Sequence, residues 1–338
     1  MTLSPRTTAI GVVIVTFNGA DVVVGCLDSL LAQTGAIPQI LVVDNASGDD
    51  TVATLRDWAA RHGHALPEAH SVEGAAEALA RDRIALLHSG ANRGFAGGVN
   101  LGLATLARLP AVGHFWVLNP DAEATPDATA AILAEAARTP GYGMMGGRVC
   151  YAETPPRIQI DGGTVNHWTG VTGNLNLGAN PATVPQPDAA QVAFITGANL
   201  VVSRRFYEDV GPMREDYFLY YEEVDWAMRR GRWPIVVAPG FVVRHHAGTA
   251  IGSPTLDRIA SPFSFWFKYR SRMMFVRRFY PLSLPVALAH ATAKAAQLWL
   301  KGARPQATTL LRAAWGLPAP AAVRDVLSPD AQRIAFGR

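Results

Sequence analysis

The feature that most constrains the fold is a regular alternation of apolar, β-branched runs with helical patterns over the first third of the chain. Buried strands are expected at 10–18, 39–47, 84–90 and 114–120. Helices are expected at 21–33, at 49–59, at 92–106 and from Thr125, where Pro126 would take the first helical position. Strands that alternate with helices pair in parallel, and continuously apolar strands need helices on both faces. The sequence therefore predicts an α/β fold with a mostly parallel sheet flanked by helices.

The pattern changes after this alternating part. Hairpins are expected at 151–178, a strand, turn, strand and helix at 191–211, a helix at the end of the acidic stretch 214–231, and two short strands before a His pair at 233–252. Only the Ala/Pro-rich stretches 67–81 and 313–323 are of low complexity, and no internal repeat is present. We expect two domains, a sheet-containing body at 1–255 and a basic, mainly helical region at 256–338.

Composition places the chain among globular intracellular proteins. Of its 338 residues, 49% are hydrophobic and 17% charged, which is ample material for a core. Cys26 and Cys150 fall in apolar segments, so we expect buried thiols and no disulfide framework. The N-terminal apolar run is too short for a signal peptide, and no run approaches the roughly 18 apolar residues of a membrane-spanning helix. We expect a cytoplasmic protein, at most peripheral on the inner face of the cytoplasmic membrane.

Positive charge is concentrated near the C-terminus. Between Arg258 and Arg324 there are eleven Lys and Arg residues and no Asp or Glu, although the net charge of the chain is only +3. Within this region, 262–281 interleaves aromatic residues with the cations Lys268, Arg270, Arg272, Arg277 and Arg278. This helix could lie in a membrane interface and attract anionic lipid, or it could pack on the body or in an oligomer contact. Nucleic acid is not an expected partner, because no nucleic-acid motif accompanies the cations.

Polar residues follow each of the four predicted strands. They are Thr16 and Asn18, Asp44 and Asn45, Asn92 and Arg93, and Asn119 and Asp121. The carboxyl ends of parallel strands meet at one edge, which is where such sheets bind ligands, although helix caps and turns also favour Asp and Asn. In Asn119-Pro120-Asp121, the carboxylate could hold a hard divalent cation together with phosphate oxygens. The same tripeptide is also an ordinary turn.

Seven motifs occur together and in order: VIVTFN, VVDNAS, NRGFAGGVN, WVLNPDA, ITGANLVVSRR, YFLYYEEVDWAMR and VRHHAG. The set resembles the inverting family 2 glycosyltransferases of the GT-A fold, closest to the rhamnosyltransferase-like branch that builds bacterial cell-surface polysaccharides. The resemblance covers roughly residues 8–280 and implies a Rossmann-like catalytic domain at 1–255. It also implies sugar transfer by single displacement, from dTDP-rhamnose or a UDP-sugar to a cell-surface glycan or lipid-linked acceptor, with Mg²⁺ or Mn²⁺.

The resemblance also implies a donor and metal site. Nucleotide-sugar binding falls to Thr16, Asn18, Asp44, Asn45, Arg93, Gly94, Gly98, Asn119 and Gly197. Asp44 would accept the ring N–H of uracil or thymine, and Asp121 and His245 would be metal ligands. The family has an Asp-x-Asp motif where this chain has Asn119-Pro120-Asp121, which removes one negative charge. His246 is the less favoured member of the His pair, and either His could be an ordinary buried side chain.

The acid-rich segment Glu222-Glu223-Val224-Asp225 matches the position of the family's catalytic acids. The resemblance implies that Glu223 is the general base, which takes the proton of the attacking acceptor hydroxyl. Glu222 and Trp168 would contact the acceptor, although Trp168 could instead fill a core. We assign Asp225 to an i,i+4 ion pair with Arg229. Without the resemblance, these acids would be read as the acidic first turn of a helix.

Two enzymatic alternatives lack their motifs. A nucleotidyltransferase needs Lys or Arg directly after the first strand, and VTFNGADVVV contains neither. A dinucleotide-dependent oxidoreductase needs Gly-x-Gly-x-x-Gly at that place, and GFAGGVNLG follows the third strand with different spacing. A non-catalytic subunit that binds carbohydrate remains an alternative, and an oligomer is also compatible with the sequence.

Overall fold

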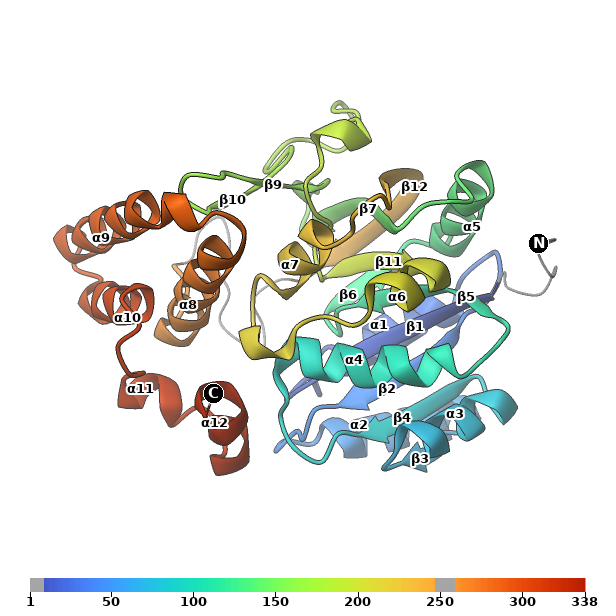
Figure 1. Ribbon diagram of the computed structural model, residues 1–338. Helices are drawn as coiled ribbons and strands as arrows, with labels where there is room; N and C mark the ends of the chain where they lie inside the picture. Colours follow the sequence, from blue (N-terminus) through green and yellow to red (C-terminus); the bar gives the residue numbers. More distant parts are fainter. Residues whose placement is uncertain (1–8, 247–258, 338) are drawn as a thin grey trace.

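The computed structural model describes residues 9–246 and 259–337. A mixed sheet crosses the molecule with helices on both of its faces, and the C-terminal helices form a separate group at one side (Figure 1). The main path of the sheet has the order β3-β4-β2-β1-β5-β11-β7-β12-β6. Its core is divided between the two faces, because alternate residues of each buried strand enter different apolar clusters.

The first half of the sheet is parallel, as predicted. β1 (Ala9–Thr16) pairs with β2 (Gln39–Asp44) on one side and with β5 (Val112–Leu118) on the other. Outside β2 lie β4 (Ile84–His88) and the two-residue strand β3 (Glu68–Ala69), also parallel. Because these strands run in one direction, their carboxyl ends meet along one edge.

The second half is mixed. β11 (Asn199–Ser203) is antiparallel to both β5 and β7 (Met144–Tyr151), and β12 (Ile235–His245) runs parallel to β7. β6 (Ala122–Ala124) pairs antiparallel with the end of β12. Where we predicted two short strands at 233–252, the described part is one strand with a register shift between Val237 and Val242.

Three short strands lie beside this path. β8 (Ile158–Ile160) pairs with β7, and β9 (Gly163–Val165) with β10 (Thr172–Asn174) forms the separate hairpin predicted in this region. In the segment 191–211 the predicted first strand is reduced to a bridge at Phe194, and β11 leads into α6 (Arg204–Val210).

Helices cover both faces of the sheet. One face carries α1 (Val23–Leu31), α2 (Thr51–His62) and α5 (Ala128–Arg138), and the other carries α3 (Val72–Arg81) and α4 (Gly94–Ala107). The architecture is the predicted one, a largely parallel sheet between two helical layers.

The helix α4 packs unusually closely on β1. A Cβ on Gly98 would lie 2.6 Å from Cγ1 of Val15, and one on Gly102 would overlap Val13. Small residues on this helix therefore let its first turn approach the end of β1, which brings Gly94 to the sheet edge. Gly98 itself serves this packing.

The Ala/Pro-rich stretch 67–81, for which we predicted no element, forms β3 followed by α3, which Ser71 caps by accepting a hydrogen bond from the backbone N–H of Gly74. One predicted boundary was wrong. The helix expected from Thr125 begins at Ala128, because residues 122–124 are drawn into the sheet as β6. Pro126 therefore precedes the helix.

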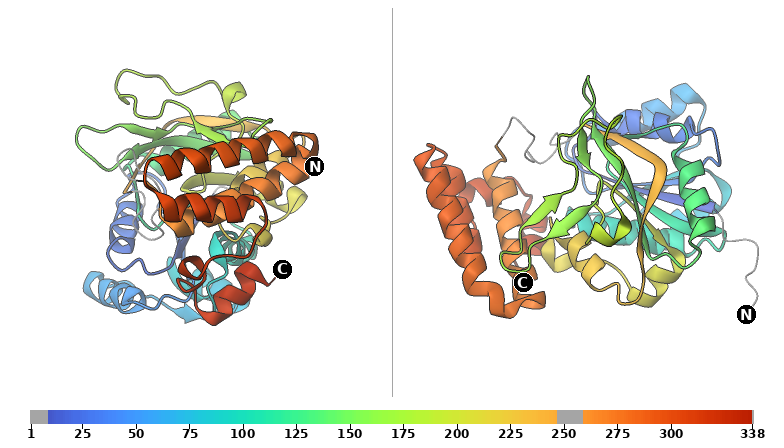
Figure 2. Two further views of the ribbon diagram at one scale, coloured as in Figure 1. Left: turned by 90° about the vertical axis from the view of Figure 1, so that its left-hand side faces the viewer. Right: turned by 90° about the horizontal axis from the view of Figure 1, so that it is seen from above.

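The C-terminal region is helical, as predicted. It contains α8 (Pro262–Phe279), α9 (Leu284–Leu300), α10 (Arg304–Ala314), α11 (Ala321–Arg324) and α12 (Pro329–Phe336). α8 lies nearest the sheet, and α9 and α10 form an outer layer beyond it (Figure 2). The predicted boundary between residues 255 and 256 lies outside the described residues, so the division into two domains stays a prediction.

The aromatic residues of α8 are packed in the interior. Phe263, Trp266, Phe267, Tyr269 and Phe275 are all buried. Burial of these side chains fits the packing interpretation, with Phe267 against Phe218 of the body and against Phe336 of α12, and contact with a membrane stays a prediction. No helix among the described residues has the combined length and hydropathy of a membrane span.

Candidate active site

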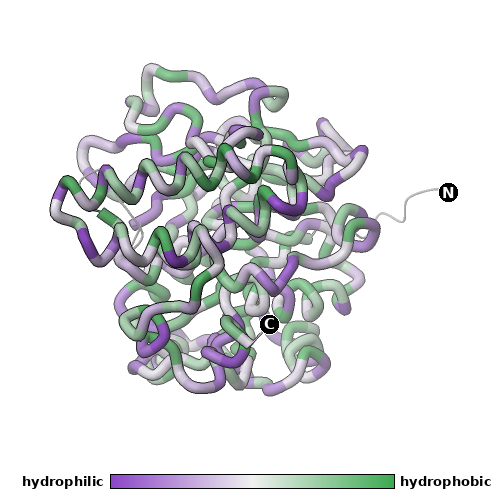
Figure 3. The backbone as a smooth tube through the Cα atoms, turned by 60° about the vertical axis from the view of Figure 1, so that its left-hand side comes forward, coloured by the Kyte–Doolittle hydropathy of each residue, from purple (hydrophilic) through white to green (hydrophobic). Residues whose placement is uncertain are grey.

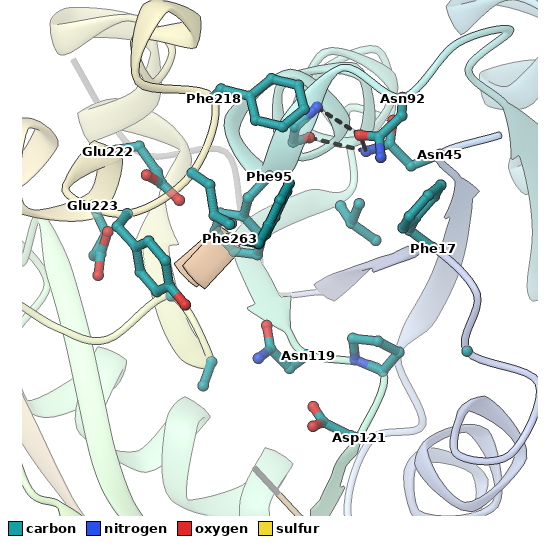
Figure 4. A pocket seen from close by; sticks show the side chains of 18 of the residues that line it. Phe17, Asn45, Asn92, Phe95, Asn119, Asp121, Phe218, Glu222, Glu223 and Phe263 are labelled. Atoms are coloured by element: carbon teal, nitrogen blue, oxygen red, sulfur yellow. Dashed lines mark hydrogen bonds between the residues drawn. The ribbon is translucent and has the colours of Figure 1, made fainter. Parts of the chain in front are cut away.

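A cavity of about 560 Å³ opens where the parallel strands end (Figure 4). Phe17 lines it after β1, Asn45 after β2 and Asn119 after β5. Phe263 at the start of α8 and Leu327 beyond α11 belong to the same lining. The cavity is therefore built jointly by the edge of the sheet and the C-terminal helices.

Asn119, Asp121 and His245 converge at one part of this cavity. Nε2 of His245 lies 3.0 Å from Oδ1 of Asp121 and 3.2 Å from Nδ2 of Asn119. Nδ1 of the same ring lies 2.7 Å from Oε1 of Gln159, a contact that fixes the orientation of the imidazole. Asp121 and His245 are both buried. A carboxylate, an imidazole and a side-chain amide thus meet at one point.

The pairing of β6 with β12 explains this convergence. Ala122 lies opposite His245 in the antiparallel register, and the backbone N–H of His246 donates to the carbonyl oxygen of Asp121 at 2.9 Å. Residues far apart in the sequence are thereby held side by side. The exposed ring of His246 turns to Glu123, at 3.3 Å, and Gly248 of the VRHHAG motif lies outside the described residues.

Asn45 organises a second part of the lining. Its Nδ2 donates to Oδ1 of Asn92 at 3.2 Å and to the carbonyl oxygen of Gly94 at 3.0 Å, and its Oδ1 accepts from the backbone N–H of Arg93 at 3.1 Å. Figure 4 shows hydrogen bonds among Asn45, Asn92 and Gly94 at the wall of the cavity. The buried amide of Asn45 therefore ties the end of β2 to the start of α4.

Gly94 is the point at which α4 meets the loop that precedes α7 (Glu222–Met228). Its φ is +72°, and an added Cβ would overlap the carbonyl oxygen of Phe218. That same oxygen accepts a hydrogen bond of 2.8 Å from the backbone N–H of Phe95. Only glycine allows both the turn and the close approach.

Gly94→Ala is expected to destabilise the fold more than Gly90→Ala does. Both positions have positive φ, which costs a residue other than glycine about 1–2 kcal/mol, but nothing lies within 4 Å of a Cβ at Gly90. Chemical denaturation of the two variants isolates the contact with Phe218. Equal losses of unfolding free energy would contradict a tight contact between α4 and this loop.

The loop before α7 has a strained backbone. Phe218, Tyr220 and Tyr221 have φ values of +64°, +66° and +71°, a region that such bulky residues seldom occupy. Strain of this kind persists only where the surroundings enforce it, and it gathers at functional sites. Glu222 and Glu223 follow immediately, at the N-terminus of α7.

The helix α8 holds this loop in place. Oγ of Ser271 donates to the carbonyl oxygen of Leu219 at 2.9 Å, and Nη1 of Arg270 donates to that of Tyr217 at 3.2 Å. The hydroxyls of Tyr220 and Ser264 share a hydrogen bond of 3.0 Å. The C-terminal region therefore shapes the segment that presents the two glutamates.

Glu222 and Glu223 both line the cavity (Figure 4). Burial raises the pKa of both carboxyl groups. Burial, followed by the charge of Glu223, raises the pKa of Glu222 well above its usual value. Oε2 of Glu222 has no hydrogen-bond partner among the described residues. Burial also raises the pKa of Glu223, to about 7, against the opposing effect of backbone N–H donors and of the Lys268 charge. The pair thus combines a carboxyl whose protonated form is favoured by burial with one that ionises near neutrality.

Asp225 has the structural role that we assigned to it. It is fully buried, and its Oδ1 accepts from Nε of Arg229 at 2.7 Å. Its Oδ2 accepts from the hydroxyl of Tyr217 at 3.0 Å and lies 3.3 Å from Nε of Arg278 on α8. Asp225 therefore anchors α7 and is turned away from the glutamate pair.

The predicted donor-site residues fall into two groups. Asn45, Gly94, Asn119 and Gly197 line the cavity. Its lining among the described residues does not include Thr16, Asn18, Asp44, Arg93 or Gly98. A role of the second group at a nucleotide stays a prediction.

The contacts of Thr16, Asn18 and Asp44 explain why these three side chains do not line the cavity. Thr16 is fully buried, because Val15 and Phe17 occupy the alternate positions that face the cavity. Oδ1 of Asn18 accepts from the backbone N–H of Gly48 at 2.8 Å, and the buried carboxylate of Asp44 lies 3.8 Å from Nδ1 of His88.

Trp168 is neither a core residue nor part of this cavity lining. It lies in the segment between β9 and β10, and its side chain is 55% exposed. The interpretation as a core residue is therefore wrong, and contact with an acceptor stays a prediction.

Sequence reasoning missed several residues of the site. Phe17, Phe95, Phe218 and Phe263 give the cavity aromatic walls (Figure 4). Phe17 could have been found from the two-residue period of β1, since Val15 already faces that side. Gln159 beside His245 and Lys268 near Glu223 carry no local signal, because only the tertiary fold brings them there.

Comparison with known proteins places this geometry in a family context. Residues 11–211 match the family model described as glycosyl transferase family 2. The chain is 27% identical over 282 residues to N-acetylglucosaminyl-diphospho-decaprenol L-rhamnosyltransferase of Mycobacterium tuberculosis, covering 75% of this chain and 81% of that one. It is 24% identical over 253 residues to the low-salt glycan biosynthesis hexosyltransferase Agl10 of Haloferax volcanii, covering 73% and 70%.

Among solved structures, a crystal structure of GalNAc-T7 with UDP, GalNAc and Mn²⁺ matches with a TM-score of 0.59 and 12% identity. The match covers 87% of this chain and about half, 52%, of that one. At this identity the likeness concerns the fold.

Proposed function

The chain belongs to glycosyl transferase family 2 and has the GT-A fold, and on that premise we propose that it is a metal-dependent inverting transferase. The donor is dTDP-rhamnose or a UDP-sugar, and the acceptor is a lipid-linked or cell-surface glycan. The observation that carries the proposal is that Asp121 and Glu223 line one cavity from different elements. Asp121 is suited to bind a cation, and Glu223 is suited to accept a proton.

The part of the cavity around Asp121 suits a nucleotide diphosphate and its cation. Mg²⁺ and Mn²⁺ favour oxygen ligands and commonly bind through one or two protein groups plus substrate phosphates. No three His, Cys, Asp or Glu side chains of the described residues gather as a metal site by themselves. Asp121 and His245 would therefore hold the cation together with diphosphate oxygens. The bound cation would offset the charge of the departing diphosphate.

The part around Glu223 suits the acceptor. In the proposed reaction the acceptor oxygen bonds to the anomeric carbon while the bond from that carbon to the nucleotide diphosphate breaks. The acceptor proton passes to the carboxylate of Glu223, and the bonding electron pair leaves with the diphosphate. Because attack and departure take place on opposite faces, one carboxylate at the reacting carbon suffices.

Glu222 and Lys268 support this base in different ways. As a buried, protonated carboxyl, Glu222 would hydrogen-bond the acceptor without competing for its proton. The charge of Lys268 lowers the pKa of Glu223 toward neutrality. The base is therefore ionised in a large fraction of molecules at the pH of the cytoplasm.

The rhamnosyltransferase relative favours a particular pair of substrates. Its name describes transfer of L-rhamnose to a diphosphate-linked N-acetylglucosaminyl lipid. We propose dTDP-rhamnose and a lipid diphosphate carrying N-acetylglucosamine as the substrates of this chain, with UDP-sugars as the second choice of donor.

The proposal is tested by nucleotide release. Purified protein with Mn²⁺, dTDP-rhamnose and a short-chain lipid diphosphate of N-acetylglucosamine is expected to release dTDP only when all components are present. NMR of the product should show an inverted anomeric configuration. Nucleotide binding without turnover on any donor and acceptor pair would instead favour a non-catalytic subunit.

A further inference from the structure

The outermost helix of the C-terminal group, α9, has two apolar sides. Its inner side is buried against α8 and α10 through Ala287, Ala291, Ala295 and Leu298. Its outer side continues a second apolar series that begins in the turn before the helix, here called the outer row: Leu282, Val286, Ala289, Ala293, Ala296 and Leu300. Their spacing of three or four residues aligns them along the side opposite the buried one.

The outer row is strongly exposed. Leu282 is 93% exposed, Leu300 88% and Val286 45%, and the three alanines are exposed as well. Trp299 and Trp315, each about half exposed, lie nearby, and Nε1 of Trp315 donates to Oγ1 of Thr292 on α9 at 3.3 Å. Figure 3, in which these helices lie in front, shows hydrophobic residues recurring along them. Exposed apolar side chains gathered on one side of a helix are typical of an interaction site.

The described charged side chains beside the exposed C-terminal end of the outer row are positive. Lys301 lies at the end of α9, and the guanidinium of Arg304 sits 5.5 Å from the ring centre of Trp299. No Asp or Glu occurs between Arg258 and Arg324 to neutralise them. Two copies of this face placed together would bring like charges into contact. An anionic partner with an apolar interior complements it instead.

We propose that the outer row of α9 lies on an anionic bilayer surface, with Trp299 and Trp315 at the headgroup level and Lys301 and Arg304 on lipid phosphates. A helix with an apolar side and flanking cations is suited to lie in the plane of such an interface. The inference goes beyond the proposed function, because lipid binding requires neither donor nor acceptor.

The connection between α9 and α8 gives this contact a consequence for the cavity. Phe263 at the start of α8 lines the cavity, and the end of α8 leads through Pro281–Ser283 into α9. A bilayer bound by α9 would therefore lie against the group of C-terminal helices, which supplies Phe263 and Leu327 to the cavity lining.

Vesicle co-sedimentation of the full chain tests the proposal. The vesicles are phosphatidylcholine alone and an equal mixture of phosphatidylcholine and phosphatidylglycerol. We expect binding to the anionic mixture that weakens at high salt, and a loss of at least about tenfold in Val286→Glu/Leu300→Glu and in Lys301→Glu/Arg304→Glu. The matched control is Ile37→Glu/Leu177→Glu, which adds the same charge at exposed apolar positions of the sheet-containing body and should bind like the wild type.

Each alternative result overturns the proposal. Equal binding of the wild type and the two α9 variants would show that another surface meets lipid. Absence of vesicle binding, together with a dimer in sedimentation velocity that the Val286→Glu/Leu300→Glu variant dissociates, would assign the outer row to a second copy of the chain. Calorimetry of dTDP with each variant reports the donor site separately, so failure of lipid binding is distinguishable from failure of the proposed function.

Discussion

Glu223→Gln is expected to lower kcat by about 10²–10⁴-fold, the usual contribution of a general base. The amide keeps the size of the side chain but cannot accept the proton of the acceptor hydroxyl. Nucleotide affinity should change little, because the Asp121 part of the cavity is built from other elements. The measurements are steady-state kinetics for turnover and calorimetry for dTDP or UDP binding.

Glu222→Gln is the matched control for this change. Burial raises the pKa of the Glu222 carboxyl and so favours its neutral form, with which the amide is nearly isosteric, and we expect a loss of less than about tenfold. In the wild type, kcat/KM should rise with pH through a midpoint near 7, as Glu223 loses its proton. Turnover of Glu223→Gln close to that of the wild type would exclude Glu223 as the base.

Asp121→Ala is expected to abolish metal-dependent nucleotide binding. Removing an outer-shell partner of a metal ligand already costs about 10–100-fold in affinity, so loss of the ligand itself should cost at least about 100-fold. Calorimetry of dTDP and UDP with and without Mn²⁺ measures this directly. The wild type should bind more tightly with Mn²⁺ and the variant equally weakly in both conditions.

Glu123→Ala controls for removal of a nearby acid. Glu123 lies two positions after Asp121 but is turned to the exposed ring of His246, so its loss should leave the Mn²⁺ effect intact. A wild type that binds dTDP and UDP equally well without Mn²⁺ would rule out the proposed metal site. That result would not test the role of Glu223 as the general base.

The sequence predicted the parallel half of the sheet well because burial there is continuous. β1, β2, β4 and β5 are apolar on both faces, so their composition alone identifies them. The roles of the residues at the strand ends were harder to predict, since a polar residue after a strand can cap a helix, form a turn or bind a ligand. Thr16 and Phe17 illustrate the problem, because the period of the strand sends the apolar side chain into the cavity and buries the hydroxyl.

The predictions that failed concern residues whose packing partners are distant in the sequence. α8 has the composition of an interfacial helix, yet its aromatic residues are buried against the body, and the exposed apolar series lies on α9, which the sequence did not single out. Lys268 reaches Glu223 only because α8 packs beside α7. Local patterns predict which residues are apolar or charged, but the packing partner decides which of them are exposed.

The clamp of α8 on the strained loop at 218–221 has a consequence for the order in which this protein matures. A ribosome completes the sheet and α7 before it makes Ser264, Arg270 and Ser271, whose hydrogen bonds hold the loop. Until those residues emerge, the loop has only its contacts with the sheet-containing body, such as the hydrogen bond from the backbone N–H of Phe95 to the carbonyl oxygen of Phe218. The cavity also lacks Phe263 and Leu327 until then, so it can be completed only near the end of translation.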